Sequence, residues 1–404
     1  MLRSVRYGAN YLHDQADRYP VFLAFGPSLQ DVRIIATKIY PSAFVREQYR
    51  TPEEIYSRAI QRLAFAPSLR TLYVSTAGFW GRNWRSMDYL SLSLEYAIFY
   101  AGFQSLTDIS VPDIPLLPYA LYRLASISSL NTVNICICSS DYHWDSIPHG
   151  ARFPTCFALV EHLTIRSDSF DWCIGFLRTF PLQSLRTISI ATDDIVLPPL
   201  LHTFADTLAA SPSAQMGAIV YINLQLGCFS ERPLAEAVPI YGGAELASFF
   251  PFSSLTQLYI SGHCHVLLDN NALEAVSRAW PRLRYLGLEP ARCSKDAQIA
   301  QGLHPQQPRG TLLGLLPIAE RCHELRELSL ELDLATAPSS AELRRALSRL
   351  AARHSPCPLH TLTIGWSPLG DPVSLASSLS AWFPCLSRIV TARGTEVISE
   401  EQWP

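Results

Sequence analysis

The chain has 404 residues, of which 48% are hydrophobic and 17% are charged. This much apolar material suffices for a large buried core and excludes a disordered chain. The formal net charge of −3 excludes the basic surface that drives binding to nucleic-acid phosphates, so no nucleic-acid partner is expected.

The ends of the chain and its cysteines indicate an intracellular protein. Charge interrupts the segment from Met1 to Gly8, which therefore does not read as a signal peptide. The uncharged stretch from Leu124 to Ser140 is rich in Ser and Asn and is too polar to span a membrane. The ten cysteines include no CxxC pair, as expected for reduced thiols. We expect a cytoplasmic or nuclear protein with no membrane contact.

One six-residue phrase recurs from the N-terminus to the C-terminus, with apolar residues at its first, fourth and sixth positions. Its clearest copies begin at Leu69, Leu130, Val160, Leu185, Leu255, Leu283, Leu325 and Leu359, and weaker copies begin at Leu29, Leu106, Ile219 and Leu386. The last two apolar positions stand two apart, which places both side chains on one face of a strand. Each phrase therefore predicts a short strand, and stacking the copies would bury a continuous core.

Between the phrases, apolar residues follow the spacing of helices. Four helices are predicted, each from an inward stripe of apolar residues and three also from a capping sequence at their start. In the first half, Thr51-Pro52-Glu53-Glu54 precedes the stripe Ile55, Ala59 and Leu63. In the second half the stripes are Leu273, Val276 and Trp280; Leu343, Leu347 and Leu350 after Ser339-Ser340-Ala341-Glu342; and Leu375, Leu379 and Trp382 after Asp371-Pro372. Strands and helices are thus expected to alternate.

This alternation predicts an α/β fold, an irregular leucine-rich-repeat-like solenoid with parallel strands on the concave side and helices on the convex side. The spacing varies from 24 residues between Leu106 and Leu130 to 42 between Leu283 and Leu325, so insertions are expected. We predict a single domain over 1–404, with irregular N-terminal coils over 1–66, main repeats over 67–382 and a C-terminal cap and tail over 383–404.

A regular leucine-rich repeat carries Asn or Cys three residues after the last apolar position of the phrase. Here Cys138 follows that rule, whereas the slot holds Asp168, Asp193 and Asp333 in other copies and Ala77 and Ala291 in two more. The hydrogen-bonded ladder of side chains is therefore expected to be incomplete, and the coils to be bent or distorted.

Several passages in a shared order resemble the repeat region of F-box proteins from basidiomycete fungi. They are Phe103 to Pro112, Asn271 to Val276 leading into Trp280 to Leu286, Thr311 to Ala319 leading into Cys322 to Leu328, and Asp371 to Val373 before Phe383 to Leu386. The resemblance covers most of the chain. It implies the substrate-recognition region of a cullin-based ubiquitin ligase, whose repeats hold a target protein while the F-box holds the adaptor.

The sequence departs from that plan at its start. An F-box opens on a Leu-Pro-x-Glu-type phrase, and nothing between Met1 and Leu29 provides one. Two interpretations follow: an orphan repeat scaffold with no ubiquitin link, or a chain whose true start lies upstream and supplies the F-box. The ligase adaptor and cullin are expected as partners only in the second case.

Four local patterns suggest chemistry, and each has a simpler interpretation. His263-Cys264-His265 offers two imidazoles but no further ligands at zinc spacing, and a loop is the simpler interpretation. Cys136-Ile137-Cys138 places two sulfurs on one side of a strand, where packing is the simpler role. His143-Trp144-Asp145 lacks a partnered nucleophile, and Gly242-Gly243 lacks a phosphate-binding companion. Hydrolase, zinc-protease and nucleotide-binding motifs are absent, so we expect no enzyme, cofactor or metal.

The candidate functional residues are the outward positions of the strand phrases, because their spacing is rigid and repeated. Tyr and Arg supply many interface hot spots. The predicted protein-binding residues are His162, Arg186, Tyr259, Arg284, Tyr285, Arg326, Glu327 and His360. The alternative is that they are merely solvated strand positions. The sequence thus predicts a protein-binding repeat module and names no target.

Overall fold

Every copy of the phrase forms a β-strand, and each strand begins two residues after the first apolar residue of its phrase. The computed structural model describes residues 3–8, 27–35, 57, 60–76, 88–100, 103–138, 156–227, 238–290, 307–336, 338–351 and 356–391. Contacts divide the chain into two compact units, Met1–Leu185 and Arg186–Pro404. The single domain over 1–404, with its internal boundaries, stays a prediction.

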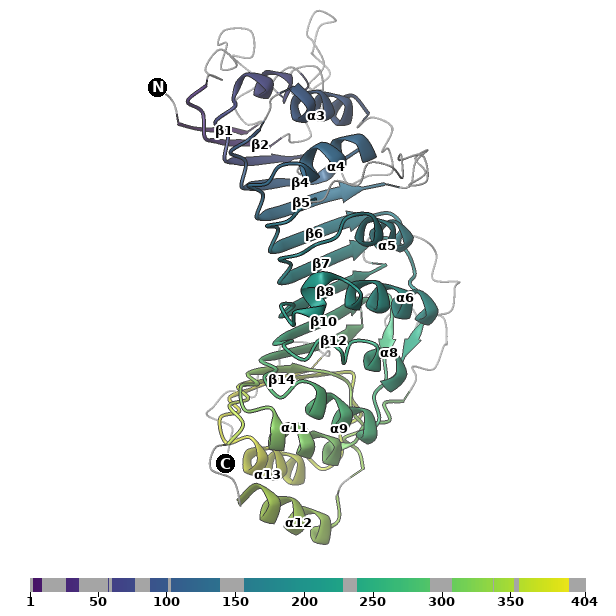
Figure 1. Ribbon diagram of the computed structural model, residues 1–404. Helices are drawn as coiled ribbons and strands as arrows, with labels where there is room; N and C mark the ends of the chain where they lie inside the picture. Colours follow the sequence, from purple (N-terminus) through teal and green to yellow (C-terminus); the bar gives the residue numbers. More distant parts are fainter. Residues whose placement is uncertain are drawn as a thin grey trace, which may run out of the picture. The chain divides into compact units, whose positions relative to one another are not determined.

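The first unit stacks its strands in the order of the sequence, each parallel to the one before it. The strands are β1 (Ser4–Gly8), β2 (Asp31–Ile35), β3 (Thr71–Ser75), β4 (Asp108–Pro115), β5 (Thr132–Ile137) and β6 (His162–Ser167). The helices are the 3-10 turn η3 (Leu63–Phe65), α3 (Asp88–Tyr100), α4 (Pro118–Ala125) and α5 (Phe170–Thr179). These helices lie together on one side of the strands (Figure 1).

The second unit repeats this design with parallel strands in the order β7-β8-β10-β12-β13-β14-β15. They are β7 (Thr187–Thr192), β8 (Tyr221–Leu226), β10 (Gln257–Gly262), β12 (Tyr285–Pro290), β13 (Glu327–Ser329), β14 (Thr361–Gly365) and β15 (Arg388–Thr391). A separate parallel pair joins β9 (Ile240–Tyr241) to β11 (His265–Val266).

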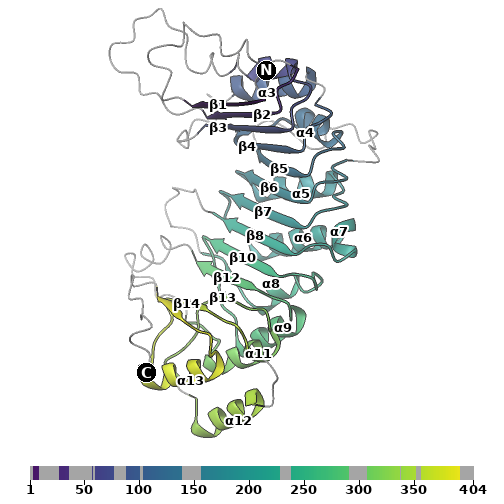
Figure 2. The same ribbon diagram turned by 90° about the vertical axis from the view of Figure 1, so that its left-hand side faces the viewer.

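The helical segments of the second unit are α6 (Pro198–Ala209), α7 (Pro212–Gln215), α8 (Gly243–Ala247), α9 (Asn270–Ala279), the 3-10 turn η6 (Leu312–Gly314), α11 (Leu315–Arg321), α12 (Ser340–Ala351) and α13 (Pro372–Trp382). Figure 2 shows α6, α8, α9 and α11 beside one face of these strands. Each unit is therefore an irregular α/β solenoid of leucine-rich-repeat type, which confirms the predicted fold class.

Neighbouring coils are joined where the chain enters each strand. The carbonyl oxygen of Arg284 accepts hydrogen bonds from the N–H groups of Arg326 (2.9 Å) and Glu327 (3.2 Å). The carbonyl oxygen of Arg326 accepts from His360 (2.8 Å) and Thr361 (3.1 Å) in the same way. This double acceptance recurs from coil to coil in both units, so the residue just before each strand has a fixed backbone position.

The core is the layer between strands and helices, and the apolar positions of the phrase fill it. In the coil of β10, Leu255, Leu258 and Ile260 are fully buried. The first apolar residue of the phrase is buried in every copy except Leu386, which is half-buried in the final described coil. The inward assignment of the repeated apolar residues is thus confirmed.

Three of the predicted helices form, and one stripe needs correction. Asp371 caps α13 by accepting the N–H of Ser374 at 2.9 Å, and Leu273 and Val276 of α9 are fully buried. On α12 the predicted inward residue Leu347 is 42% exposed, whereas Ala346 is buried. Among the described side chains of α12, Leu343, Ala346 and Leu350 are the least exposed, so Ala346 takes the inward position that was predicted for Leu347.

The remaining predicted helix lies mostly outside the described residues, which include neither Thr51 to Tyr56 nor Ala59. The described part ends in η3, where Leu63 is buried as predicted. Strands β1, β9 and β11 were not predicted. The segment Leu2-Arg3-Ser4-Val5-Arg6-Tyr7 carries the apolar spacing of the phrase and overlaps β1, so the sequence analysis missed this copy, whereas β9 and β11 follow no copy.

Candidate functional site

Side chains alternate along each strand between the core and the opposite face, which we call the strand face. In the second unit the register aligns Tyr221, Gln257, Tyr285, Glu327, Thr361 and Arg388 in one row across the strands. A second row two residues further along contains Asn223, Tyr259, Gly287, Ser329, Thr363 and Val390. These rows are half-buried or exposed for the most part, so they form a surface of fixed spacing.

The eight predicted binding residues fall into two sets. His162, Tyr259, Tyr285 and Glu327 lie in strands and occupy the strand face of their own units, whereas Arg186, Arg284, Arg326 and His360 each precede a strand by one residue. The second set therefore lies at the entry edge of the strands, where the double hydrogen bond turns the chain. A binding role for any of the eight stays a prediction.

Two of the edge residues already have partners within the protein. Arg284 forms an ion pair with Glu324 at 2.6 Å, and its Nε donates a hydrogen bond to the same carboxylate at 2.7 Å. Nδ1 of His360 lies 3.1 Å from the carbonyl oxygen of Cys385. Arg326 and Glu327 are exposed, and the structure pairs neither with another charged residue among those it describes.

Two predicted tyrosines meet on the strand face. The ring centroids of Tyr259 and Tyr285 lie 6.0 Å apart, and the hydroxyl of Tyr259 donates a hydrogen bond to Oε2 of Glu289 at 3.4 Å. Burial, with a smaller contribution from the carboxylate of Glu289, raises the pKa of Tyr285 well above its usual range. Its phenol therefore stays protonated at physiological pH and acts as a hydrogen-bond donor with an apolar ring.

Beside these tyrosines lies a pocket of about 270 Å³ formed by the coils of β12 to β15. Its wall contains two residues from the predicted set, Tyr285 and Glu327, and four that sequence reasoning missed, Glu289, Glu331, Trp366 and Arg388. The pocket thus combines two aromatic side chains, three carboxylates and one guanidinium among the described residues that line it.

Hydrogen bonds within the protein fix two of the carboxylates. The Ser329 hydroxyl donates to Oε1 of Glu289 at 2.5 Å, and the backbone N–H of Trp366 donates to Oε1 of Glu331 at 3.2 Å. Glu331 is only 4% exposed, whereas Glu327 is exposed at the rim. Glu289 and Glu331 occupy the same slot of the repeat, one residue after its last apolar position, so aligning the phrases one residue further would have found both.

The other chemical patterns have structural roles where they are described. His263 and Cys264 lie in the loop after β10, as predicted, whereas His265 begins β11; Cys264 and His265 are buried. Cys136 and Cys138 are buried with their sulfurs 3.9 Å apart, in agreement with a packing role. No group of three potential metal ligands occurs among the described residues. His143-Trp144-Asp145 lies outside the described residues. In the Gly242-Gly243 pair, the backbone N–H of Gly242 donates a hydrogen bond to Oε2 of Glu245 at 2.6 Å, at the start of α8.

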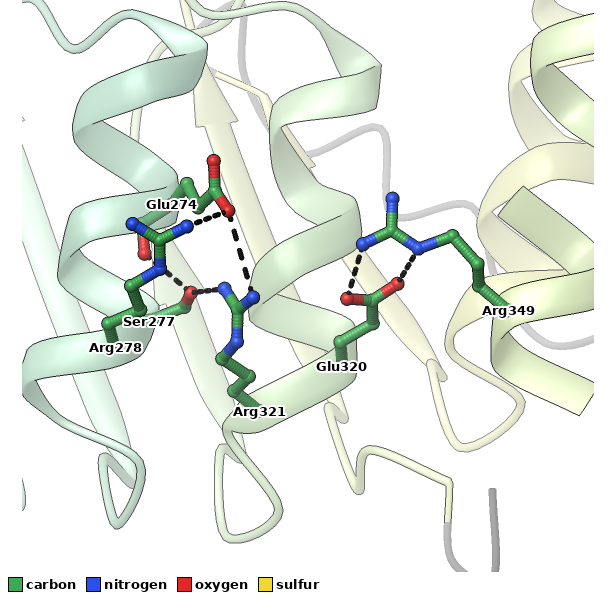
Figure 3. Close-up of polar contacts among 6 residues, drawn as sticks. All are labelled: Glu274, Ser277, Arg278, Glu320, Arg321 and Arg349. Atoms are coloured by element: carbon green, nitrogen blue, oxygen red, sulfur yellow. Dashed lines mark hydrogen bonds and ion pairs between the residues drawn. The ribbon is translucent and has the colours of Figure 1, made fainter. Parts of the chain in front are cut away.

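The helical layer of the second unit carries a separate set of polar contacts (Figure 3). Glu274 of α9 forms ion pairs with Arg278 at 2.6 Å and with Arg321 of α11 at 3.7 Å. Arg349 of α12 forms an ion pair with Glu320 of α11 at 2.7 Å. The Glu274–Arg321 and Glu320–Arg349 pairs join successive helices and so hold neighbouring coils together, whereas the Glu274–Arg278 pair lies within α9.

Comparisons with known proteins identify no family for this chain. No protein-family model matches it, and no curated protein matches it in sequence. Among solved structures, a chain in the crystal structure of the Rad7 and Elc1 complex of yeast aligns over 87% of this chain and 77% of its own length, with a TM-score of 0.38 and 11% identity. In the described part of the chain, no helix has the length and apolarity needed to cross a membrane.

Proposed function

We propose that this chain is a protein-binding repeat module that contacts its partner through the strand face of the second unit. One observation carries the proposal: the register places Tyr285 beside Glu327 on a rigid parallel sheet, next to the pocket that both residues line. Tyrosine side chains in well-packed sites are typical of binding hot spots, and charged neighbours provide electrostatic complementarity.

The proposed activity is binding rather than catalysis. The titratable groups that meet on the strand face are the phenols of Tyr259 and Tyr285, the carboxylates of Glu289, Glu327 and Glu331, and the guanidinium of Arg388. A general base must be ready to accept a proton near neutral pH. The raised pKa of Tyr285 keeps that group protonated, so it suits hydrogen bonding in an interface better than proton transfer.

Site-specific photocrosslinking tests the proposal. A photoreactive amino acid replaces Glu327 on the strand face in one variant and Asp206 on α6 in the matched control, since both positions are exposed acidic residues of the second unit. We expect one partner protein to crosslink from the Glu327 position and not from the Asp206 position. Equal crosslinking from both positions, or crosslinking from Asp206 alone, would contradict the proposal.

The more specific proposal is that the bound protein is a substrate of an F-box-type ubiquitin ligase. Two of the passages that resemble fungal F-box proteins overlap a helix and the strand after it, α9 with β12 and α11 with β13, and a third covers the start of α13 and the residues just before β15. This agreement supports the resemblance at the level of whole coils. The alternative is an orphan scaffold of the cytoplasm or nucleus with no ubiquitin link.

Affinity purification from a fungal host separates these two proposals. The chain is compared with a version extended upstream into any in-frame coding sequence, and both are blotted for the ligase adaptor and cullin. Recovery of the adaptor with either version supports the ubiquitin ligase proposal. Its absence from both, together with recovery of the crosslinked partner, supports the orphan scaffold.

A further inference from the structure

The pocket on the strand face has an unbalanced charge. Glu289, Glu327 and Glu331 contribute three carboxylates to its wall, whereas Arg388 is the one cationic side chain among its described lining residues. The carboxylates come from the coils of two neighbouring strands, β12 and β13, and so converge on one space. A positively charged group is therefore the complementary occupant.

The acceptor atoms are held in place before any ligand arrives. Glu289 accepts hydrogen bonds from Ser329 and Tyr259, and Glu331 accepts one from the Trp366 backbone. A carboxylate has about four lone-pair sites on its two oxygens, so Glu289 keeps acceptor capacity after its two contacts. Preorganised acceptors reduce the entropy lost on binding.

The size and the walls of the pocket indicate a side chain rather than a separate small molecule. Its volume of about 270 Å³ lies below the roughly 300–1,000 Å³ of ordinary small-molecule sites. Tyr285 and Trp366 also line it, and aromatic rings attract ammonium and guanidinium groups. The aliphatic stem of a lysine or arginine side chain would pack on these rings while its charged end meets the carboxylates.

We infer that this pocket receives a lysine or arginine side chain from a basic segment of the bound protein. The inference rests on the proposed protein-binding function and adds the chemistry of the partner. The chain's own residues after Thr391 are a poor alternative by charge, since they carry Glu396, Glu400 and Glu401 against Arg393 alone. A second copy of the chain is the other occupant that the test must distinguish.

Fluorescence anisotropy with the full chain and labelled hexalysine, hexaarginine and hexaglutamate peptides tests the inference. We expect both basic peptides to bind, with affinity falling as salt rises, and hexaglutamate not to bind. Glu327→Gln should weaken basic-peptide binding by about fivefold to tenfold, whereas Arg388→Gln should strengthen it by about twofold to fivefold.

The matched control is Asp206→Asn, which removes one negative charge from the helical layer of the same unit. Its affinity for the basic peptides should stay within about twofold of the unmodified chain. Equal effects of Glu327→Gln and Asp206→Asn would mean that only net charge matters and would overturn the inference.

Sedimentation of the chain alone tests the second copy as occupant. Self-association that Glu327→Gln abolishes would assign the pocket to a second copy instead. Crosslinking from Glu327 with no basic-peptide binding would leave the proposed function standing and the inference refuted.

Discussion

The ring of Tyr259 lies over Gly287 of the next strand, so close that a Cβ atom added to Gly287 would come within 2.3 Å of the ring. The absence of a side chain at this buried position lets the Tyr259 ring settle against the sheet with its hydroxyl directed to Glu289. The geometry of the strand face therefore depends on one glycine in its second row.

Gly287→Ala should displace the Tyr259 ring and destabilise the protein by about 1–3 kcal/mol, the usual cost of overpacking. Urea unfolding measures this loss, with Gly242→Ala as the control because the nearest atom to an added Cβ there is 3.5 Å away. The control should change the free energy of unfolding by about 1 kcal/mol or less, since its main effect is the replacement of Gly by Ala at the start of α8. Equal losses would show that Gly287 does not shape the face.

Leu258 of β10 is fully buried and belongs to the second apolar position of its phrase. Leu258→Ala should cost about 2–5 kcal/mol because it leaves a cavity. Leu258→Asp should cost more, because it also buries an unpaired carboxylate. Thermal unfolding compares these variants with Gln257→Asp, which places the same carboxylate on the strand face. An unchanged melting temperature for Leu258→Asp would refute the inward assignment.

The ion pair between Arg349 and Glu320, drawn in Figure 3, is asymmetric in its exposure. The Glu320 side chain is 10% exposed, whereas that of Arg349 is 56% exposed. Arg349→Ala should destabilise the protein by about 1–3 kcal/mol, since it leaves a nearly buried carboxylate without its cation. Arg278→Ala, which breaks a more exposed pair, should cost less than about 1 kcal/mol. Chemical denaturation of the two variants distinguishes them, and a smaller loss for Arg349→Ala would contradict this account.

Buried phenols predict a loss of stability at alkaline pH. Burial is the main cause that raises the pKa of Tyr241 and of Tyr285 well above the usual range of a tyrosine, and the Tyr241 hydroxyl also donates a hydrogen bond to the carbonyl oxygen of Val196 at 2.5 Å. Below pH 10 both the folded and the unfolded states keep these protons, so stability is unaffected. Above about pH 10 the unfolded state loses protons that the folded state retains, and stability falls as pH rises.

Absorbance titration of tyrosine ionisation, followed together with circular dichroism, measures this effect. Some phenols should ionise only as the protein unfolds, and Tyr241→Phe should remove part of that late phase. Complete ionisation of all tyrosines before unfolding begins would contradict the proposed burial.

The repeated phrase predicted the strands because its apolar spacing reports directly which side chains face the core. It did not predict the turns after the strands, where the side-chain ladder was expected to be incomplete. There the buried hydroxyls of Ser167 and Thr192 accept the N–H groups of Ser169 and Asp194, each at 3.2 Å. Ser167 and Thr192 stand one position before the slot where a regular leucine-rich repeat carries Asn or Cys. Their short-range hydrogen bonds therefore take the place of the bonds that an asparagine side chain makes in a regular repeat.

The candidate site was predicted only in part. Tyr285 and Glu327 were predicted as outward residues from the alternation of side chains along strands. Glu289 and Glu331 also line the pocket, but their positions depend on how the coils of β12 and β13 end. Arg284 was predicted to bind a partner protein, but in the structure its side chain forms an ion pair with Glu324, which lies 40 positions along the chain. Contacts of this kind are set by packing between coils and leave no local pattern.

The most direct test of a strand-face binding site is the affinity of the crosslinked partner, once purified, for two matched variants. Thr361→Arg places a long side chain on the strand face beside Glu327, and Thr203→Arg makes the same change on α6 of the helical layer. Isothermal titration calorimetry should show at least about a hundredfold weaker binding for Thr361→Arg and less than about a threefold change for Thr203→Arg, with both proteins folded. Unchanged affinity for Thr361→Arg, or an equal loss for both variants, would contradict binding at the strand face.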